Sequence, residues 1–243
     1  VDWKFYPTTL LAQCDSCIGS KSSINVGTYK NQVGTFYPPK SIVVDVSFLS
    51  TLSNDDILSG LGEAIKVHYL DPQKRSERID HDYSAALTSK KCMEDLIRKS
   101  LIIKKDVIEK DEFDQNIRRL FNYGHSFGHA IETASNYKIP HGIAISMGMY
   151  IANNYSDTIK NLDKKKLNYI NMILSKNFLK FKNKKINFQV FQKSLKKDKK
   201  NIGKKITLIL PTNYTFEIFK TQIEPNSKFW NICEEILSNI KKL

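Results

Sequence analysis

The pattern of hydrophobic and polar residues predicts a short start with strands, followed by a long helical part. VDWKFY (1–6) is typical of a strand, and the β-branched run SIVVDV (41–46) is typical of a short buried strand. Between them, TTLLAQCDSC follows Pro7 and predicts a short helix that a threonine can cap. Residues 18–31 are polar and contain glycine, which indicates a loop.

From about Asp55 onward, apolar residues recur with the period of a helix. We expect helices at 56–69, about 84–110, about 117–136, 142–155 and 163–176. ITLIL (206–210) and TFEIFK (215–220) alternate as paired strands do, and the last segment, KFWNICEEILSNIKKL, predicts an amphipathic closing helix. The fold class is therefore mainly α with a few short strands.

The strands at the start of the chain are too few to form a sheet of their own. A chain that opens directly on a strand is therefore expected to continue a sheet domain that lies upstream of Val1. We predict two units, residues 1–54 as the end of an α/β domain and residues 55–243 as a helical domain.

The chain is strongly basic, with a formal net charge of +13 from 38 Lys+Arg against 25 Asp+Glu. Most of the excess lies between about Lys160 and Lys205. Lysine dominates over arginine there, and aromatic residues do not interleave regularly, as a nucleic-acid stacking surface would require. The pattern favours solvated helix faces over a nucleic-acid site, and part of the charge can serve an anionic small substrate.

Composition also bears on where the protein works. The chain has no run of about 18 apolar residues, so no membrane span is expected. Its first residues carry an early acid and no apolar core, which argues against a signal peptide. Cys14, Cys17, Cys92 and Cys233 lack the spacing of a disulfide framework. We therefore predict a cytoplasmic protein with reduced thiols.

One predicted helix carries a stripe of polar side chains. Arg118, Asn122, His125 and His129 follow one another at intervals of four, three and four residues, which places them on one helix face. His141 begins the next predicted helix, where the helix dipole favours the neutral imidazole that metals bind. From spacing alone, His125 and His129 are the candidate zinc ligands, although an amphipathic helix with surface histidines gives the same pattern.

A carboxylate that could complete a metal site is Glu63, within LSGLGEAIKVHYL. Lys66 follows one turn later, so an exposed ion pair is the alternative, whereas the flanking glycines and apolar residues favour burial. In the predicted loop, Lys21 and Lys30 stand near glycines, as in sites that hold phosphate. Neither a Walker A motif nor a G-x-G-x-x-G motif occurs in the sequence.

Several segments taken together resemble the dehydroquinate synthase family of sugar-phosphate cyclases. The matching blocks are PTTLLAQCDSCIGSKSSIN, YKNQVGTFYPPKSIVVDVSFLSTL, SGLGEAIK, KKDVIEKDEFDQNIRRLFNYGHSFGHAIE, HGIAISMGM and, more loosely, DKKNIGKKITLIL. The resemblance implies an N-terminal NAD-binding α/β domain, a C-terminal helical metal-binding domain and an active site between them. Residues 1–54 would then be the end of the NAD-binding domain, most of which is lacking, so this chain by itself is expected to be inactive.

The resemblance also implies roles for individual residues. The metal ligands that it implies are Glu63, His125 and His141, and the metal is Zn²⁺ or alternatively Co²⁺ or another divalent ion. His129 then matches a catalytic acid and base instead of a ligand. The other matched catalytic positions are Lys21, Lys66, Asn122 and Asp15. Positions matched to NAD contacts are Thr8, Thr9, Lys21, Lys30, Phe48, Leu49, Ser50 and Thr51. Positions matched to substrate contacts are Asn31, Lys104, Asp114, Arg118 and one of Lys199 and Lys200.

The implied reaction is the NAD- and zinc-dependent conversion of 3-deoxy-arabino-heptulosonate 7-phosphate to 3-dehydroquinate with elimination of phosphate. This is a lyase of the shikimate pathway of aromatic amino acid biosynthesis, expected to work as a homodimer on a small sugar phosphate. Two alternatives are a metal-dependent polyol dehydrogenase, against which the phosphate-binding lysines argue, and a non-catalytic basic binding module, against which the complete set of Glu63 and the histidines argues.

Some positions depart from the family pattern. Gly19-Ser20-Lys21-Ser22 stands where G-G-K-T is usual, and Cys17 stands where serine is usual. These changes leave room for a cyclase that acts on another sugar phosphate. The C-x-x-C motif of Cys14 and Cys17 has no second pair, and we interpret it as incidental to the substrate-facing wall around Asp15.

Overall fold

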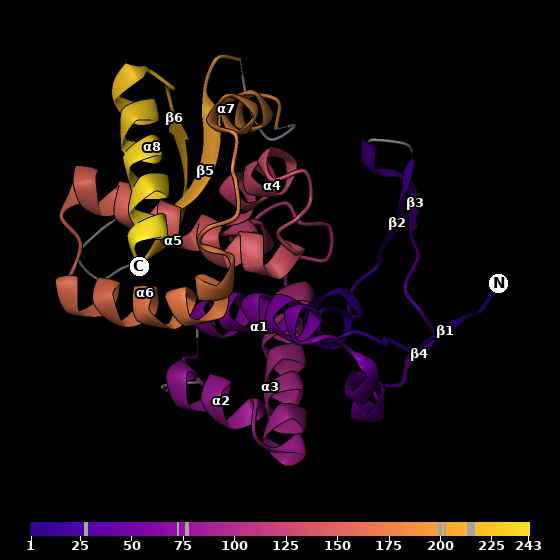
Figure 1. Cartoon of the computed structure of the whole chain (residues 1–243). Coiled ribbons are helices and arrows are strands. Elements are labelled where there is room, and N and C mark those ends of the chain that lie inside the picture. Colours follow the sequence, from indigo (N-terminus) through magenta and orange to yellow (C-terminus); the bar gives the residue numbers. More distant parts are fainter. Residues whose placement is uncertain (27–28, 72, 76–77, 199–200, 202, 213–216) are drawn as a thin grey trace.

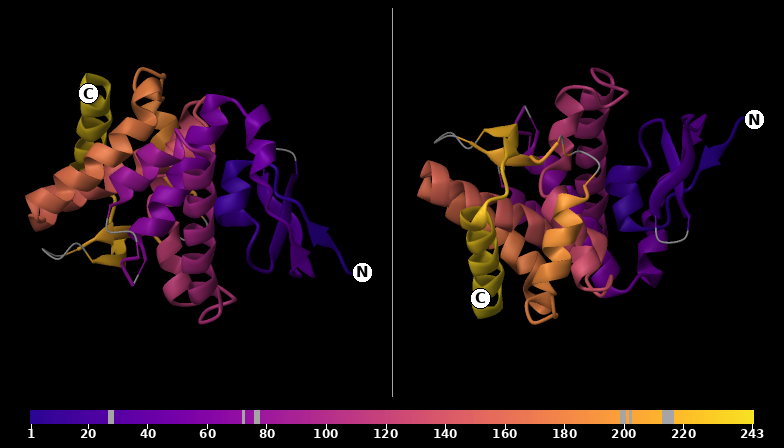
Figure 2. Two further views of the ribbon diagram at one scale, coloured as in Figure 1. Left: turned by 90° about the horizontal axis from the view of Figure 1, so that it is seen from below. Right: turned by 90° about the horizontal axis from the view of Figure 1, so that it is seen from above.

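The computed structural model describes residues 1–243 apart from 27–28, 72, 76–77, 199–200, 202 and 213–216, and leaves out the side chains of 25 and 29–32. Figure 1 shows a body of helices with the N-terminal strands on one side of it and a further pair of strands among the C-terminal helices. Both views in Figure 2 keep the N-terminal strands on one side of this body and the C-terminal helix on the opposite side.

The N-terminal part consists of two pairs of strands and two short helical segments. β1 (Lys4–Phe5) pairs in parallel with β4 (Ser41–Ile42), and β2 (Lys21–Val26) pairs in antiparallel fashion with β3 (Tyr29–Phe36). The predicted helix after Pro7 is present as η1 (Ala12–Ser16), a π-helical turn. Thr9 caps it as expected, since its Oγ1 accepts a hydrogen bond from the Ala12 N–H at 3.2 Å.

Two predictions for this part were wrong. Residues 18–31 are not a loop, because most of them belong to the hairpin of β2 and β3. The hairpin leaves apolar side chains such as Ile24 and Val33 exposed, so no buried face imposed a recognisable alternation on its sequence. The run 41–46 is a strand only at Ser41–Ile42, and it is not buried, because it pairs with a two-residue strand and Val43 is 40% exposed.

The helical part is built around two central helices, α1 (Asn54–Tyr69) and α5 (His141–Lys160). Around them lie η2 (Val46–Thr51), α2 (Ile79–Ala86), α3 (Lys90–Ile108), η3 (Ile117–Asn122), α4 (His125–Ala134), α6 (Lys164–Phe178) and η4 (Leu179–Phe181). The order ends with α7 (Phe188–Lys196), the antiparallel hairpin of β5 (Ile206–Pro211) and β6 (Ile218–Ile223), and α8 (Ser227–Lys242).

Two predicted helices are interrupted in the structure. The helix expected at 84–110 is divided into α2 and α3 at Ser89, whose Oγ accepts a hydrogen bond from the Cys92 N–H and so starts a new helix. The helix expected at 117–136 is divided into η3 and α4 at Gly124, whose φ of 76° lies in the left-handed region. The polar stripe of Arg118, Asn122, His125 and His129 is therefore not on one continuous helix.

The core lies where α5 crosses its neighbours. The residues of α5 from Ile143 to Ala152 are almost all buried, because α1, α4, α6 and β5 surround that helix. At the crossing of α1 and α5, the Gly142 N–H donates to Ser59 Oγ at 2.9 Å, and a Cβ on Gly142 would lie 1.7 Å from the Ser59 carbonyl oxygen. Glycine at position 142 thus permits α1 and α5 to approach each other closely beside Glu63 and His141.

No helix in the described ranges combines the length and the apolar character that a membrane crossing requires.

Burial of His68 in α1 makes the stability of the protein sensitive to pH. Its Nε2 lies 2.9 Å from Ser100 Oγ, which itself donates to the Leu96 carbonyl oxygen, so the imidazole is the donor in this pair. Burial lowers the pKa of His68 from 6.5 to about 4. The unfolded chain therefore takes up a proton at a higher pH than the folded protein does.

We expect the free energy of unfolding to decrease as the pH falls from about 6.5 to about 4, by roughly 3 kcal/mol in total from this residue. Urea unfolding between pH 7 and pH 4 measures it. His68→Gln, which keeps a donor for Ser100, should flatten the slope, whereas His81→Gln at a side chain that is 62% exposed should leave it unchanged. Equal slopes for the protein and His68→Gln would contradict this origin of the pH dependence.

Candidate metal and substrate site

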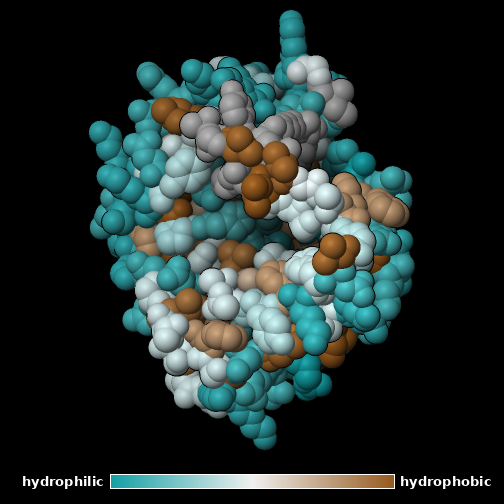
Figure 3. Space-filling view, turned by 90° about the vertical axis from the view of Figure 1, so that its right-hand side faces the viewer, coloured by the Kyte–Doolittle hydropathy of each residue, from teal (hydrophilic) through white to brown (hydrophobic). Residues whose placement is uncertain are grey.

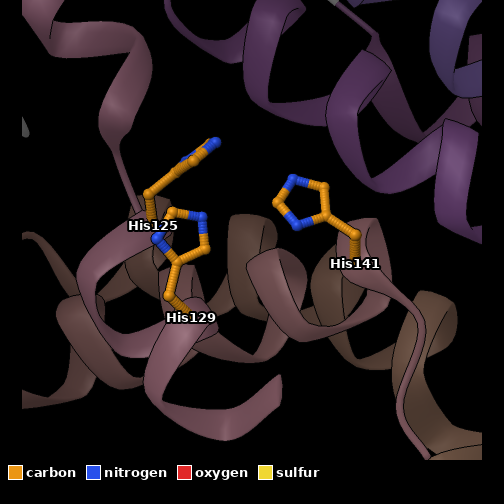
Figure 4. A group of neighbouring side chains, drawn as sticks. All are labelled: His125, His129 and His141. Carbon is orange, nitrogen blue, oxygen red and sulfur yellow. The ribbon is translucent and has the colours of Figure 1, made fainter. Parts of the chain in front are cut away.

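Three histidines meet at the start of two helices (Figure 4). His125 begins α4, His129 follows one turn later, and His141 begins α5. Each offers a ring nitrogen within 4.8 Å of those of the other two. In Figure 4, His125 and His129 rise from one helix and face His141 across a common space. Imidazole nitrogens grouped in this way are suited to a divalent metal such as Zn²⁺.

Glu63 of α1 adds a carboxylate to this cluster. Its Oε1 lies 3.2 Å from His141 Nε2 and 3.7 Å from His125 Nε2. The side chain is 1% exposed, and Oε1 is a buried oxygen that accepts no hydrogen bond from any described residue. A buried, unsatisfied carboxylate oxygen facing two imidazoles fits a metal ligand. The cluster therefore contains the ligands predicted from the resemblance and also the His125 and His129 pair predicted from spacing.

Charged neighbours set the protonation of this cluster. Burial alone would raise the pKa of Glu63, but Lys66 and His141 hold it well below the usual range of a carboxyl. Burial alone would lower the pKa of His141, but its contacts with Glu132 and Glu63 raise it to about 9. The negative charge of Glu63 and Glu132 around His141 therefore favours a cation there, either a proton on the imidazole or a metal ion that displaces it.

A chain of ion pairs extends from the cluster of Glu63 and the three histidines to the N-terminal part. The Lys66 ammonium contacts Glu63 Oε2 and lies 3.3 Å from Asp15 Oδ2, while Lys104 Nζ lies 2.5 Å from Asp15 Oδ1. Lys66 is 2% exposed, and although burial alone would lower its pKa, Asp15 and Glu63 raise it. The tertiary structure thus brings together four residues from different segments, of which Asp15 and Lys104 are 89 positions apart in the sequence.

A second basic group lies at the base of the β2–β3 hairpin. Lys21 Nζ contacts Asp114 Oδ2 at 2.7 Å, and the Arg118 guanidinium lies beside Gly19. The backbone of Arg118 is held by Asp111, whose carboxylate also accepts hydrogen bonds from the N–H groups of Gln115 and Asn116. These contacts place two predicted substrate cations, Lys21 and Arg118, at neighbouring points of one wall.

The remaining predicted residues are less closely grouped. Asn122 lies at the end of η3, and its side-chain amide donates to the Arg119 carbonyl oxygen at 3.1 Å. Thr8, Thr9 and the segment 48–51 lie on the N-terminal side, mostly exposed, with 48–51 inside η2. The side chains of Lys30 and Asn31, and both Lys199 and Lys200, lie outside the described residues.

The two cysteines of the C-x-x-C motif are buried, Cys14 within η1 and Cys17 directly after it, and both thiols donate hydrogen bonds to the backbone. Cys14 Sγ donates to the Leu10 carbonyl oxygen at 2.9 Å and Cys17 Sγ to the Gln13 carbonyl oxygen at 3.7 Å. Burial raises the pKa of Cys14 well above its usual value and that of Cys17 to about 11. Thiols of this kind are poor nucleophiles and poor ligands, which agrees with an incidental role.

Two features of the site were not predicted from the sequence. Asp111 supports the loop that carries Asp114 and Arg118, and Glu132 contacts His141 from α4. Glu132 stands three residues after His129 among apolar neighbours. A carboxylate on the buried face of a helix is unusual, and this pattern could have indicated a role for Glu132 at the site.

One cavity in the described part of the chain lies away from this cluster. Its volume is about 410 Å³, and it is lined mainly by apolar side chains of α3 and of residues 44–46. Neither the histidines nor Glu63 line it. Figure 3 shows the face on which the hairpin lies, with a hollow near its centre and hydrophobic side chains at the rim.

Comparison with known families covers most of the chain. The family "3-dehydroquinate synthase N-terminal" matches residues 1–59, and "3-dehydroquinate synthase C-terminal" matches residues 60–201. The boundary between the two lies within α1, five residues from the predicted boundary at residue 54.

Curated relatives agree with these matches. The chain is 35% identical to a 3-dehydroquinate synthase of Alkaliphilus oremlandii over 99% of its own length and 65% of that relative. It is 39% identical to a 3-dehydroquinate synthase of Helicobacter pylori over 87% of its length and 60% of that relative. The chain thus spans somewhat less than two thirds of the length of these relatives.

Solved structures show the same architecture. A 2-deoxy-scyllo-inosose synthase in complex with carbaglucose-6-phosphate, NAD⁺ and Co²⁺ superimposes with a TM-score of 0.84 at 25% identity, over 98% of this chain and 67% of that one. A 2-epi-5-epi-valiolone synthase from Streptomyces hygroscopicus with NAD⁺ and Zn²⁺ bound shares the fold with a TM-score of 0.75 at 19% identity, over 99% of this chain and 66% of that one. The chain therefore belongs to the 3-dehydroquinate synthase family.

Proposed function

We propose that this protein is a phosphate-eliminating lyase that cyclises a sugar phosphate, most simply 3-deoxy-arabino-heptulosonate 7-phosphate to 3-dehydroquinate, with NAD⁺ and a divalent metal as cofactors. The observation that carries the proposal is the meeting of Glu63, His125, His129 and His141 with the ion pairs of Lys66, Asp15 and Lys104. Family membership and cofactor-bound structural relatives support it.

In this proposal, Glu63, His125 and His141 hold the metal. When bound, the metal would polarise a substrate hydroxyl and NAD⁺ would accept and return a hydride. His129 stands beside the proposed ligands and accepts the hydroxyl proton. Lys66 is buried next to Glu63 with its pKa raised by Asp15 and Glu63, and as a cation it would orient a substrate oxygen.

The cations of the neighbouring wall would bind the anionic ends of the substrate. Lys104 and Arg118 suit a carboxylate, and Lys21 suits a phosphate. The proposed order is oxidation, phosphate elimination, reduction, ring opening and closure of the carbocycle. A substrate with both a carboxylate and a phosphate would use all three cations, Lys104 and Arg118 for the carboxylate and Lys21 for the phosphate, which favours the heptulosonate over sugar phosphates without a carboxylate.

We further propose that the enzyme is a cytoplasmic homodimer of the shikimate pathway. The four cysteines are free, which supports a reducing compartment.

The test uses the full-length protein, including any segment encoded before Val1, with NAD⁺ and Zn²⁺. We expect phosphate release from the heptulosonate, no net NADH, and loss of turnover on chelation of the metal. Phosphate release only from a sugar phosphate without a carboxylate would favour the alternative cyclase. Net NADH from a simple polyol would contradict the cyclase class altogether.

A further inference from the structure

Glu132 lies on α4 and contacts His141 on the side of the ring opposite Glu63. Its carboxylate is 6% exposed, and Oε1 lies 3.3 Å from His141 Nδ1. The opposite ring nitrogen, Nε2, faces Glu63 Oε1 at 3.2 Å. The imidazole of His141 is therefore held between two carboxylates that come from different helices, one at each nitrogen.

We propose that Glu132 is a positioning residue that selects the tautomer and orientation of His141. With a metal ion at Nε2 the imidazole keeps one proton, and a carboxylate at Nδ1 holds that proton there by accepting its hydrogen bond. Nε2 is then the nitrogen with the free lone pair, and it points towards Glu63. This inference rests on the proposed metal site and assigns a role to a residue outside the ligand set.

The location of His141 makes such a partner necessary. It is the first residue of α5, and its side chain is 32% exposed, so packing does not enclose the ring on every side. Glu132 belongs to the helix that carries His125 and His129, whereas His141 belongs to the next one. The contact therefore links the two helices at the point where the three histidines meet. Carboxylates that hold a metal-bound histidine in this way raise metal affinity by about 10- to 100-fold.

The first test measures the affinity of the purified metal-free protein for Zn²⁺ and Co²⁺ by competition with a chelator. Glu132→Gln should weaken both affinities by about 10- to 100-fold and alter the visible spectrum of bound Co²⁺. Glu132→Asp keeps the charge, and its metal affinities should lie between those of the wild-type protein and those of Glu132→Gln. The matched control is Ser135→Ala, which removes a buried hydrogen bond to the Glu132 carbonyl in the same turn without touching His141, and should leave the affinity unchanged.

The second test needs no substitution and so does not depend on how the variants fold. In the Zn²⁺-loaded protein, long-range ¹H–¹⁵N spectra should show the His141 proton on Nδ1 and the metal on Nε2. The opposite tautomer would overturn the proposal, as would an unchanged affinity in Glu132→Gln. A wild-type protein that bound no Zn²⁺ would overturn the metal site itself, and with it this role of Glu132.

Discussion

Replacing Gly142 with alanine is expected to destabilise the protein by about 3 kcal/mol and to weaken metal binding roughly tenfold or more. The added Cβ would lie 1.7 Å from the Ser59 carbonyl oxygen, a backbone atom that cannot move without its helix. The reciprocal contact is equally close, since a Cβ on Gly62 would lie 2.1 Å from the Gly142 carbonyl oxygen. α1 and α5 would have to separate.

This separation acts directly on the proposed metal site, because Glu63 follows Gly62 and His141 precedes Gly142. The 3.2 Å distance between Glu63 Oε1 and His141 Nε2 is set by that helix crossing. Denaturant unfolding and Zn²⁺ competition measure the two effects.

The control for the Gly142 variant is Gly203→Ala, where an added Cβ meets no atom within 4 Å and only the φ of 61° is unfavourable. We expect it to cost about 1 kcal/mol and to leave metal affinity unchanged. If Gly142→Ala behaved like this control, the close crossing of α1 and α5 would not be what holds the two ligands together.

Replacing Lys66 with methionine is expected to cost about 3–5 kcal/mol of stability in the metal-free protein at neutral pH. The substitution removes a buried ammonium from between Glu63 and Asp15 and leaves two carboxylates without their shared cation. Taking one partner from a buried ion pair is costly because the remaining charge keeps its desolvation penalty without the compensating attraction. Urea unfolding of metal-free protein measures this loss.

The matched control removes the same ammonium from an exposed pair. Lys180 Nζ lies 2.6 Å from Asp55 Oδ1, with the side chains 63% and 36% exposed. Lys180→Met should change stability by about 1 kcal/mol at most, because water already solvates both charges. A double variant, Lys66→Met with Glu63→Gln, should recover part of the loss of Lys66→Met. Equal effects of the two lysine substitutions would show that burial of the Lys66 pair is energetically unimportant.

The fold was predictable where the pattern was local and strong. The helices near 56–69, 142–155 and 163–176 and the strand at 206–210 are present, because their apolar periodicity coincides with buried faces. The partner strand, expected at 215–220, is observed as β6 at Ile218–Ile223, and residues 213–216 lie outside the described residues. The breaks at Ser89 and Gly124 were missed, since a serine cap and a left-handed glycine interrupt a helix without changing the apolar period around them. The short helix α7 was missed as well, inside the lysine-rich region.

The sequence by itself determined the class of fold, the family and the residue types of the site. These depend on motifs and on apolar periodicity, which can be recognised along the chain without knowing which distant residues are in contact. Only the tertiary structure decided which of these residues meet. Glu63 joins His141 across 78 positions through a glycine crossing of two helices. Asp15 joins Lys104 across 89 positions. Ligand sets and buried ion pairs depend on distances of a few ångströms, and such distances arise from how helices pack rather than from the spacing of residues along the chain.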